Sequence, residues 1–386
     1  MSEIQVRGYR RGGSFGVRNH VVAMASVSCA NSIVERVARG HPGVIAVTHQ
    51  HGCTHMGADR EQVIRALAGT CANPNVGGAL IVGLGCENVT AADVAERVPA
   101  EDRVVRTLVI QEIGSAARLF EAADAYVGEM QAFVAAQQRE PFDAAGLVVG
   151  LECGGSDPFS GITANPAVGL VSDRLVELGA TTMLSEIPEM IGAEAALESR
   201  IADPEIRRRL FARIADYVRI AHDHGTDLRY ANPSPGNIRA GLSTLEEKSL
   251  GCVIKGGRGE IVELVGYAER PSRRGLVVMD TPGNDPESVT GMVAGGAQVV
   301  LFTTGVGTPL GNPVAPVIKI ATNSRMYERM KDFIDLDAGR IIQGMPLRAV
   351  ADELFEALLA VCNGRATAAE RNECREFAIN RVGPTL

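Results

Sequence analysis

The chain has none of the long apolar runs that membrane-spanning helices and secretory signal peptides contain. No stretch of its 386 residues approaches the roughly 20 uninterrupted apolar residues of a membrane span. Residues 1–13 carry charges and glycines where a signal peptide has its apolar core. We therefore expect a cytoplasmic protein that does not act at a membrane. Its net charge of −8 also argues against nucleic acid as the main partner.

Several motifs of common cofactor sites are missing too. The eight cysteines include no Cys-x-x-Cys pair, which argues against zinc ribbons, thioredoxin-like sites and iron–sulfur cubanes. Because no secretory signal is present, we expect free thiols. No Gly-x-Gly-x-x-Gly follows the first apolar run, which argues against a nicotinamide cofactor. The Gly-rich segment 303–308 lacks the Gly-Lys-Ser/Thr of a Walker A phosphate site.

What the sequence does contain is a repeated unit of apolar run, polar loop and helical stretch. The apolar runs lie at residues 21–25, 44–47, 79–82, 104–110, 147–149, 181–184, 276–279 and 298–302. Short continuous Val/Ile/Leu runs separated by helical stretches are typical of parallel strands that are buried on both faces. The sequence therefore predicts an α/β fold of right-handed βαβ (Rossmann-like) units.

The units fall into two halves. A helical stretch over residues 113–138 ends near Pro141 and predicts a boundary between a first α/β domain, residues 1–140, and a second, residues 141–386. We expect the second domain to end in helices over residues 347–381 that cover its sheet. Its polar, glycine-rich section 232–259 is too long for an idle loop in a compact domain.

Residues 49–55, His-Gln-His-Gly-Cys-Thr-His, concentrate three of the seven histidines directly after an apolar run. Imidazole and thiolate groups bind transition metals, and imidazole also transfers protons near neutral pH. A single histidine in a loop is most often a surface residue, but this density favours a site. Loops that follow parallel strands open on one edge of the sheet, so we expect one site at the carboxyl ends of the strands, between the halves.

Other loops that follow strands carry the same kinds of side chain. They are residues 28–31, 86–88, 111–112, 152–157, 185–189, 280–285 and 303–308. A mixture of Cys, His and Glu suits Fe²⁺, Zn²⁺ or Mn²⁺ better than Mg²⁺ or Ca²⁺, which prefer oxygen ligands alone. For each carboxylate the alternative is a helix cap or a surface ion pair. We expect a mononuclear site with an open position.

With these motifs the chain resembles the altronate/galactarate dehydratase family of sugar-acid enzymes, and specifically its large catalytic part. The resemblance runs nearly from end to end. It is carried by residues 16–19 (GVRN), 49–53 (HQHGC), 73–76 (NPNV), 83–87 (GLGCE), 150–165 (GLECGGSDPFSGITAN), 184–194 (LSEIPEMIGAE), 232–237, 244–257, 282–285 (PGND) and 302–309.

The resemblance implies a divalent metal, most often Fe²⁺, and the elimination of water from a polyhydroxy acid to give a 2-keto-3-deoxy acid. Some family members carry a small N-terminal β-rich (SAF-like) domain, and in others this domain is a separate subunit. The motifs here begin at Gly8, so we expect a separate small subunit or a chain that works without one. We also expect a homo-oligomer and a small carboxylate substrate.

The resemblance and the loop positions together assign roles to particular residues. Metal ligands are expected among His51, Cys53, Cys86, Glu87, Glu152 and Cys153. His49 or His55 would act as base or acid, and Asp157, Asn165 and Glu186 would orient hydroxyl groups. The substrate would contact Arg18, Asn31, Asn237, Lys248 and Lys255, although lysines are more often solvated than bound to a ligand.

Two other functions compete with dehydration. One branch of the family resembles (2R)-sulfolactate sulfo-lyase, which expels sulfite instead of water and also has split subunits. We expect that branch to differ in the metal-type loops, whereas residues 49–53 and 152–157 keep the sugar-acid pattern here; dehydration is therefore favoured. The other alternative is a non-catalytic subunit that binds a sugar acid, against which the intact Cys/His/Glu loops argue.

Overall fold

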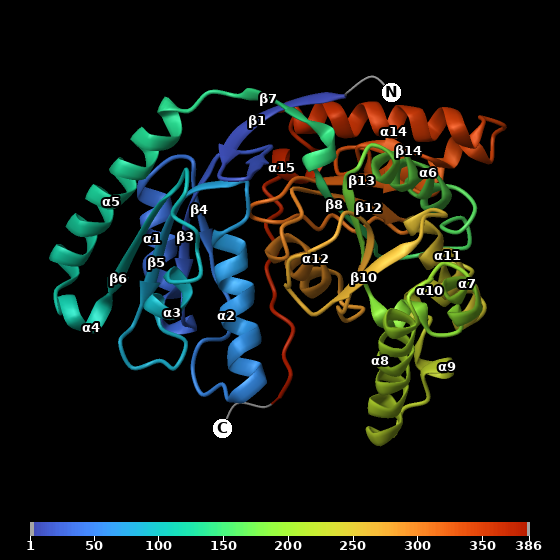
Figure 1. The fold of residues 1–386 in the computed structure, drawn as a ribbon, viewed down its shortest axis with the longest axis horizontal. Coiled ribbons are helices and arrows are strands. Elements are labelled where there is room, and N and C mark those ends of the chain that lie inside the picture. The colour runs from blue at the N-terminus through green and yellow to red at the C-terminus, as the bar shows by residue number, and fades with distance from the viewer. Residues whose placement is uncertain (1–3, 384–386) are drawn as a thin grey trace.

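The computed structural model describes residues 4–383, which form two α/β halves beside each other, as Figure 1 shows. The first half holds a four-stranded parallel sheet in the order β4-β3-β5-β6. Its strands are β3 (His20–Ala25), β4 (Val44–Val47), β5 (Val76–Gly83) and β6 (Val104–Val109). The predicted α/β fold with parallel sheets is confirmed.

The second half holds a seven-stranded parallel sheet in the order β10-β11-β9-β8-β12-β13-β14. Its strands are β8 (Val148–Cys153), β9 (Thr181–Leu184), β10 (Ile261–Val265), β11 (Gly275–Met279), β12 (Val299–Thr304), β13 (Val317–Ala321) and β14 (Leu336–Asp337). An antiparallel sheet of β1 (Gln5–Arg11), β2 (Ser14–Gly16) and β7 (Glu140–Asp143) spans the two halves.

Helices cover both faces of the first sheet. Alternate residues of each strand point to opposite faces, and on both faces these residues are apolar. Val21 and Ala23 of β3 pack in one apolar cluster with α1 (Asn31–Gly40) and α5 (Ala116–Ala136). Val22 and Met24 pack in another cluster with α2 (Gly57–Cys71) and α3 (Ala91–Ala95). Every residue of β5 is buried, as expected for a central strand of a parallel sheet.

The second sheet is also covered on both faces. Helices α6 (Ala164–Glu177), α8 (Pro204–Asp223), α11 (Leu245–Val253) and α14 (Leu347–Cys362) share one apolar cluster, and α12 (Asp285–Ala294) packs in the other. The shorter helices are α4 (Ile110–Ile113), α7 (Glu194–Glu198), α9 (Leu228–Ala231), α10 (Pro235–Arg239), α13 (Ser324–Met330) and α15 (Ala368–Arg371). The 3₁₀ turns are η1 (Ser28–Ala30), η2 (Ala144–Gly146), η3 (Ile187–Met190), η4 (Ile254–Gly256) and η5 (Gly339–Ile341).

The two halves share a packed interface. Helices α2 and α12 contribute to one apolar cluster that spans both halves. The side-chain amide of Asn73 donates to the carbonyl oxygens of Val293 and Ala297, at 2.8 and 2.9 Å. These buried bonds join the segment after α2 to the end of α12, across the interface.

The C-terminal segment differs from its predicted helix. Residues 347–381 were predicted to be helical, but α14 ends at Cys362, α15 is one short turn, and residues 372–383 run without helix along α2 (Figure 1). Gly364 and Glu373 have positive φ angles, 111° and 55°, and interrupt the helical path. The extended tail forms hydrogen bonds with both halves instead, for example with Thr290 and Tyr267 of the second half and with Asp59 of the first.

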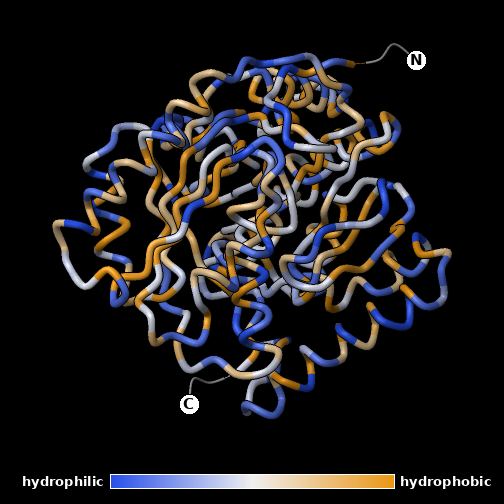
Figure 2. Tube along the Cα trace, turned by 60° about the vertical axis from the view of Figure 1, so that its left-hand side comes forward, coloured by the Kyte–Doolittle hydropathy of each residue, from blue (hydrophilic) through white to orange (hydrophobic). Residues whose placement is uncertain are grey.

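Hydropathy follows this architecture, as Figure 2 shows: apolar segments gather in the interior and polar segments form the outer turns. The longest helices, α5 and α8, carry charged residues on their exposed faces. None of the helices within residues 4–383 combines the length and the apolar character that crossing a membrane requires.

Candidate active site

The carboxyl edge of the second sheet gathers acidic, thiol and amine groups from four segments that are distant in sequence. Glu152 and Cys153 end β8, and Glu186 follows β9. Asp285 begins α12, and α11 with η4 supplies Cys252 and Lys255. These six residues are called the Glu/Cys cluster below. Five of them are buried and Asp285 is half-buried.

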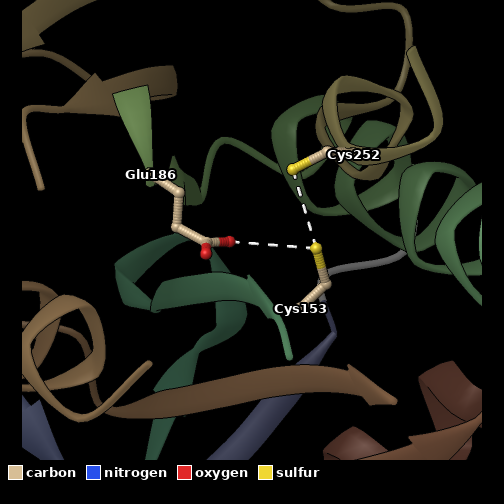
Figure 3. Close-up of side chains that lie close together, drawn as sticks. All are labelled: Cys153, Glu186 and Cys252. Carbon is tan, nitrogen blue, oxygen red and sulfur yellow. Dashed lines mark hydrogen bonds between the residues drawn. The ribbon is translucent and has the colours of Figure 1, made fainter. Parts of the chain in front are cut away.

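Two groups within the cluster have the spacing of metal ligands. One atom from each of Cys153, Glu186 and Cys252 lies within 4.8 Å of the others, and so do carboxylate oxygens of Glu152, Glu186 and Asp285. Figure 3 shows the first group: the sulfur atoms of Cys153 and Cys252 are 3.6 Å apart, and the Cys153 sulfur is 3.8 Å from Oε2 of Glu186. Glu186 belongs to both groups and therefore links them.

Lys255 supplies the positive charge of the cluster. Its Nζ donates to Sγ of Cys153 at 2.8 Å and to Oε2 of Glu186 at 3.2 Å, and the side chain is fully buried. Burial alone lowers the pKa of Lys255, but the Cys153, Cys252 and Glu186 side chains outweigh it and raise that pKa well above its usual value. Lys255 therefore stays an ammonium group. In turn, the hydrogen bond from Cys252, helped by Lys255, lowers the pKa of the Cys153 thiol.

Glu152 is buried with one of its two oxygens unused. Oε2 accepts hydrogen bonds from the hydroxyls of Ser185 (3.0 Å) and Ser288 (2.6 Å), but Oε1 has no partner. Burial, and then the Glu186 carboxylate, raise the pKa of Glu152 well above its usual value. Buried polar atoms are nearly always satisfied in native proteins, so the orphaned Oε1 is an oxygen that could coordinate a bound ion.

The backbone conformations around the cluster serve to bring the carboxylates together. Glu186 has φ of 67°, in the left-handed region that non-glycine residues seldom adopt, and its N–H donates to Oγ1 of Thr281 at 2.7 Å. At Gly154, a Cβ atom would lie 1.9 Å from Oδ2 of Asp285. Only glycine lets the Asp285 carboxylate rest against the end of β8.

The donor set fits a divalent metal ion. Three buried or half-buried carboxylates within 4.8 Å cannot all be ionised without a positive charge between them. Burial, and then the Glu186 carboxylate, raise the pKa of Asp285 to about 7. Thiolate and carboxylate ligands together suit Fe²⁺, Zn²⁺ or Mn²⁺. Glu152, Glu186 and Asp285, or Cys153, Glu186 and Cys252, are thus the residues that would hold such an ion.

A cavity of about 340 Å³ opens beside the cluster. Its lining includes Asn165, Lys248 and Gly251, the residue before Cys252. Nζ of Lys248 donates to Oε1 of Glu189 and to Oδ1 of Asn232, each at 2.8 Å. Oε2 of Glu189 is buried without a partner, and burial raises the pKa of Glu189. The ammonium group of Lys248, which lies at the wall of this cavity, thus keeps a third proton that it can donate to a ligand.

The loop 303–308 does not cradle a phosphate group. The N–H groups of Gly305 and Val306 donate to the carbonyl oxygen of Gly155, and those of Gly307 and Thr308 donate to Oγ1 of Thr304. The loop consumes its own donors, so none is left for an anion. This agrees with the absence of a Walker A sequence.

The histidine-rich loop of the first half is bonded internally. Nε2 of His49 lies 2.7 Å from the carbonyl oxygen of Ala25, and its Nδ1 accepts from the N–H of His51 at 3.1 Å. Nδ1 of His55 lies 2.6 Å from Oδ2 of Asp59, and its Nε2 accepts from the N–H of Gly52 at 3.0 Å. All four ring nitrogens are therefore engaged. Burial lowers the pKa of His49 to about 4, so this ring is neutral at pH 7.

The other expected ligands of the first half lie in different surroundings. The Glu87 carboxylate accepts from the N–H groups of Leu84 and Gly85 and from the Ser26 hydroxyl, so it stabilises its own loop. Cys53 and Cys86 are exposed. His51 is half-buried, with its ring centroid 5.5 Å from that of His55. Among residues 4–383, no potential metal group includes a residue of the first half.

Several residues expected to contact the substrate instead bind other parts of the protein. Arg18 forms an ion pair with Glu370 at 2.7 Å. Asn31 bonds the backbone of His49, and Asn237 donates to the carbonyl oxygen of Ser156. Asp157 accepts from side chains that follow β8 and β13, namely Ser160, Thr322 and Asn323.

Asn165 lies nearer the cluster. It accepts from the Thr303 hydroxyl at 2.6 Å and donates to the carbonyl oxygen of Gly251 at 2.7 Å. Of the expected site residues, the structure thus brings Glu152, Cys153, Glu186 and Lys255 together, with Lys248 and Asn165 beside them. The His49–His55 loop and the Glu/Cys cluster share no hydrogen bond or ion pair within the described part of the chain.

Sequence reasoning assigned no role to Cys252, Glu189 or Asp285, although each lies in a segment that it singled out. Asp285 could have been found, because residues 283–286 repeat the Gly-x-Asp-Pro pattern of residues 155–158 after a second strand. For Cys252 there was no such signal. It reaches Cys153 across 99 residues of sequence, through the packing of α11 against the sheet.

Two family models together match nearly the whole chain. The C-terminal model of D-galactarate/altronate dehydratase matches residues 144–385, and the second-domain model of D-galactarate dehydratase/altronate hydrolase matches residues 8–135. The chain is 38% identical to the altronate dehydratase of Escherichia coli, over 100% of this chain and 79% of that protein. It is 37% identical to the altronate dehydratase of Bacillus subtilis, over 98% and 78%. It is 36% identical to the (2R)-sulfolactate sulfo-lyase subunit beta of Chromohalobacter salexigens, over 97% of each chain.

Proposed function

Because the chain belongs to the D-galactarate/altronate dehydratase family, we propose that it is a metal-dependent hydro-lyase acting on a sugar acid. The family membership expected from the sequence motifs is confirmed. The proposed reaction removes water from an altronate- or galactarate-like acid to give a 2-keto-3-deoxy acid. The observation that carries the proposal is the Glu/Cys cluster beside a cavity of about 340 Å³.

The elimination begins with a difficult proton transfer. A proton on carbon 2, next to a carboxylate, is only weakly acidic, because its removal adds negative charge to an anion. A bound divalent ion, for which we favour Fe²⁺, would act as a Lewis acid on that charge. Glu152, Glu186 and Asp285 would hold the ion, with Cys153 and Cys252 as the alternative ligands next to Glu186.

The chain's own side chains divide the remaining tasks. Lys248 lines the cavity and would bind the substrate carboxylate with its free proton, while Glu189 and Asn232 hold its position. Glu189 keeps one oxygen without a partner, which would accept the carbon-2 proton. Lys255 stays protonated inside the cluster and would donate to the departing hydroxyl. Asn165 would orient a substrate hydroxyl.

Proton transfer by His49 or His55 would first require the loss of internal hydrogen bonds, because both nitrogens of each ring are occupied. We therefore place the acid and the base in the second half. The His49–His55 loop then stabilises the edge of the first sheet. His51, whose ring has a half-buried position, is the histidine of this loop that remains available for a ligand.

The test is anaerobic purification of the full chain, metal analysis, and a screen of sugar acids with added Fe²⁺. Formation of 2-keto acid from altronate, galactarate or a related acid would support the proposal and identify the substrate. Glu186→Gln is expected to abolish turnover and lower the bound metal. Glu287→Gln, which changes a half-buried glutamate outside the cluster, is the matched control and should retain both. A chain that binds no metal and converts no acid would contradict the proposal.

A second candidate function is carbon–sulfur lysis. The match to the sulfo-lyase subunit beta extends over 97% of both chains, whereas the chain spans about four-fifths of the two altronate dehydratases. Sulfolactate therefore belongs in the same screen, with sulfite as the product measured. Release of sulfite, without keto acid from any sugar acid, would favour this function over dehydration.

The match to the sulfo-lyase relative also supports a partner subunit. The name of the sulfo-lyase relative describes that protein as one subunit, and we propose that this chain also works with a separate small subunit, in a homo-oligomeric assembly. Metal-loaded protein that is inactive alone and active after addition of a small subunit would support this. A non-catalytic, sugar-acid binding role would be favoured if the chain bound a sugar acid but no metal.

A further inference from the structure

The sulfur atoms of Cys153 and Cys252 lie in van der Waals contact in the interior of the second half, 3.6 Å apart (Figure 3). The cysteines come from different elements: Cys153 ends β8, and Cys252 lies in the last turn of α11. Among the eight cysteines, this is the one pair of the described residues with a sulfur–sulfur contact. A disulfide bond has a length of about 2.05 Å, so the sulfurs would have to approach by roughly 1.5 Å.

From this geometry we infer that Cys153 and Cys252 form a reversible oxidation site, which peroxide converts into a disulfide bond inside the proposed metal centre. The consequence for catalysis rests on the proposed function, whereas formation of the bond does not. Within residues 4–383, no other pair of cysteines has its sulfur atoms in hydrogen-bond contact.

The surroundings of Cys153 favour attack on peroxide. Nζ of Lys255 is 2.8 Å from the Cys153 sulfur, so the reacting sulfur has a hydrogen-bond donor beside it. A thiolate, and not a thiol, is the nucleophile in cysteine oxidation. Burial is not complete, since Cys153 keeps 5% of its surface exposed. A neighbouring cavity is lined by Gly251, the residue directly before Cys252.

The chemistry balances with hydrogen peroxide as the oxidant. The Cys153 thiolate attacks one peroxide oxygen, the O–O bond breaks, and hydroxide leaves; Cys153 is then a sulfenic acid. Cys252 attacks the sulfur of that sulfenic acid, the S–S bond forms, and the hydroxyl group leaves with the Cys252 proton as water. Overall, two thiols and one peroxide give one disulfide and two water molecules. A dithiol such as dithiothreitol reverses the change.

Oxidation would act on the metal centre through its ligands. A disulfide has no anionic sulfur to offer a metal ion, so Glu186 would lose both sulfur partners of its group. Lys255 would lose the thiolate that it contacts and keep only Glu186. We expect the oxidised protein to bind metal more weakly and to recover after reduction.

The experiment uses the full, reduced chain without added metal, exposed to a small excess of hydrogen peroxide and digested under non-reducing conditions. The expected result is a cross-linked peptide pair containing Cys153 and Cys252, lighter by two hydrogen atoms than the sum of its parts. Dithiothreitol should remove the cross-link. Cys252→Ser should abolish it and leave Cys153 as a sulfenic or sulfinic acid. Cys29→Ser, at an exposed cysteine of the first half, is the matched control and should retain the cross-link.

Three results would overturn the inference. The first is oxidation of the exposed cysteines while Cys153 and Cys252 both remain thiols. The second is sulfinic acid at Cys153 with Cys252 unmodified in the unsubstituted chain. The third is an N–O–S bond between Lys255 and Cys153, seen as a gain of one oxygen and a loss of two hydrogens. If the cross-link forms in a chain that is inactive on every acid, the proposed function fails and the oxidation site stands. If an active chain forms no cross-link, the oxidation site fails and the proposed function stands.

Discussion

Nζ of Lys255 lies 2.8 Å from Sγ of Cys153, and solvent reaches neither the amine nor most of the thiol. A buried ammonium group is costly unless anionic partners surround it. Here the partners are the Cys153 sulfur and the Glu186 carboxylate, both of which are candidates for the metal centre. The same lysine therefore stabilises the fold and compensates the charge of the site when no metal is bound.

The Lys255 contact predicts a large stability effect. Lys255→Met removes the ammonium group and leaves Glu186 and Cys153 without a counter-charge. We expect the metal-free protein to lose about 3 kcal/mol of unfolding free energy, as when one partner of a buried ion pair is removed. Urea unfolding measures this loss. Lys331→Met, at an exposed lysine, is the control and should change stability little; an equal loss in both variants would contradict the interpretation.

The cluster also predicts an unusual dependence of stability on pH. Burial raises the pKa of Asp285 to about 7, whereas the unfolded carboxyl group loses its proton near 4. Between these pH values the folded state binds more protons than the unfolded state, so the stability of the metal-free protein should fall as pH rises from about 4 to about 7. Thermal unfolding across this range should show the decline. Asp285→Asn should make it shallower, and an unchanged slope in that variant would contradict the assignment.

The pKa of Lys319 predicts that stability rises with pH in a higher range, opposite to the effect of Asp285. Its Nζ is buried without a hydrogen-bond partner, 3.3 Å from the ring centroid of Phe302, and burial lowers its pKa to about 7. The unfolded lysine keeps its proton up to about 10.5. The unfolded state therefore binds more protons between these values, and stability should rise with pH from about 7 to about 10. Lys319→Met should flatten this rise. If stability rose with pH as steeply in the variant as in the unsubstituted protein, the rise would come from other groups.

The C-terminal tail depends on Asp59. Its carboxylate accepts from Arg381 (3.0 Å), from the N–H of Val382 (2.9 Å) and from His55 (2.6 Å). Burial by itself raises the pKa of Asp59, but these bonds outweigh it and lower that pKa. Their stabilisation is therefore present above pH 4 and is lost as pH falls through the folded pKa.

We expect Asp59→Asn to destabilise the protein by about 2 kcal/mol, since it weakens hydrogen bonds to a charged group. The variant should also speed tryptic cleavage at the arginines of the tail. Limited proteolysis followed by mass spectrometry measures the rate. Asp124→Asn alters an exposed carboxylate that pairs with His41 and serves as the comparison; equal cleavage rates in the two variants would show that Asp59 does not hold the tail.

Lys248 predicts a defect in substrate binding. Lys248→Met removes the ammonium group from the cavity wall and leaves the shape of the side chain nearly unchanged. If Lys248 binds the substrate carboxylate, kcat/KM should fall roughly 10- to 100-fold, which corresponds to the loss of a charged hydrogen bond. The loss should appear mainly as a higher KM. Steady-state kinetics on the substrate found in the screen decides this, and an unchanged KM would move the carboxylate site elsewhere.

Much of the fold could be predicted from local patterns, but the candidate site could be predicted only in part. The Val/Ile/Leu runs predicted parallel strands, and the residues predicted to follow these runs include Glu152 and Cys153, which end β8, and Glu186, which follows β9. The dense histidines of residues 49–55 suggested a metal site by composition. In the structure, the ring nitrogens of His49 and His55 form hydrogen bonds with the backbone and with Asp59. The composition of a segment shows which groups are present. The hydrogen bonds that these groups form with the rest of the protein decide which of them remain available to bind a ligand.

The sequence by itself determined the α/β class, the positions of the strands and the family, because hydrophobic period, strand length and motif spacing are local properties of the chain. Only the tertiary structure decided which loops meet. The strand order places β8 between β9 and β12, so residues 33 to 136 positions apart converge on Glu152 and Cys153. That convergence follows from the packing of whole elements, which no short stretch of sequence encodes. Cys252 is the clearest case, since only the position of α11 against the sheet brings its sulfur into contact with Cys153.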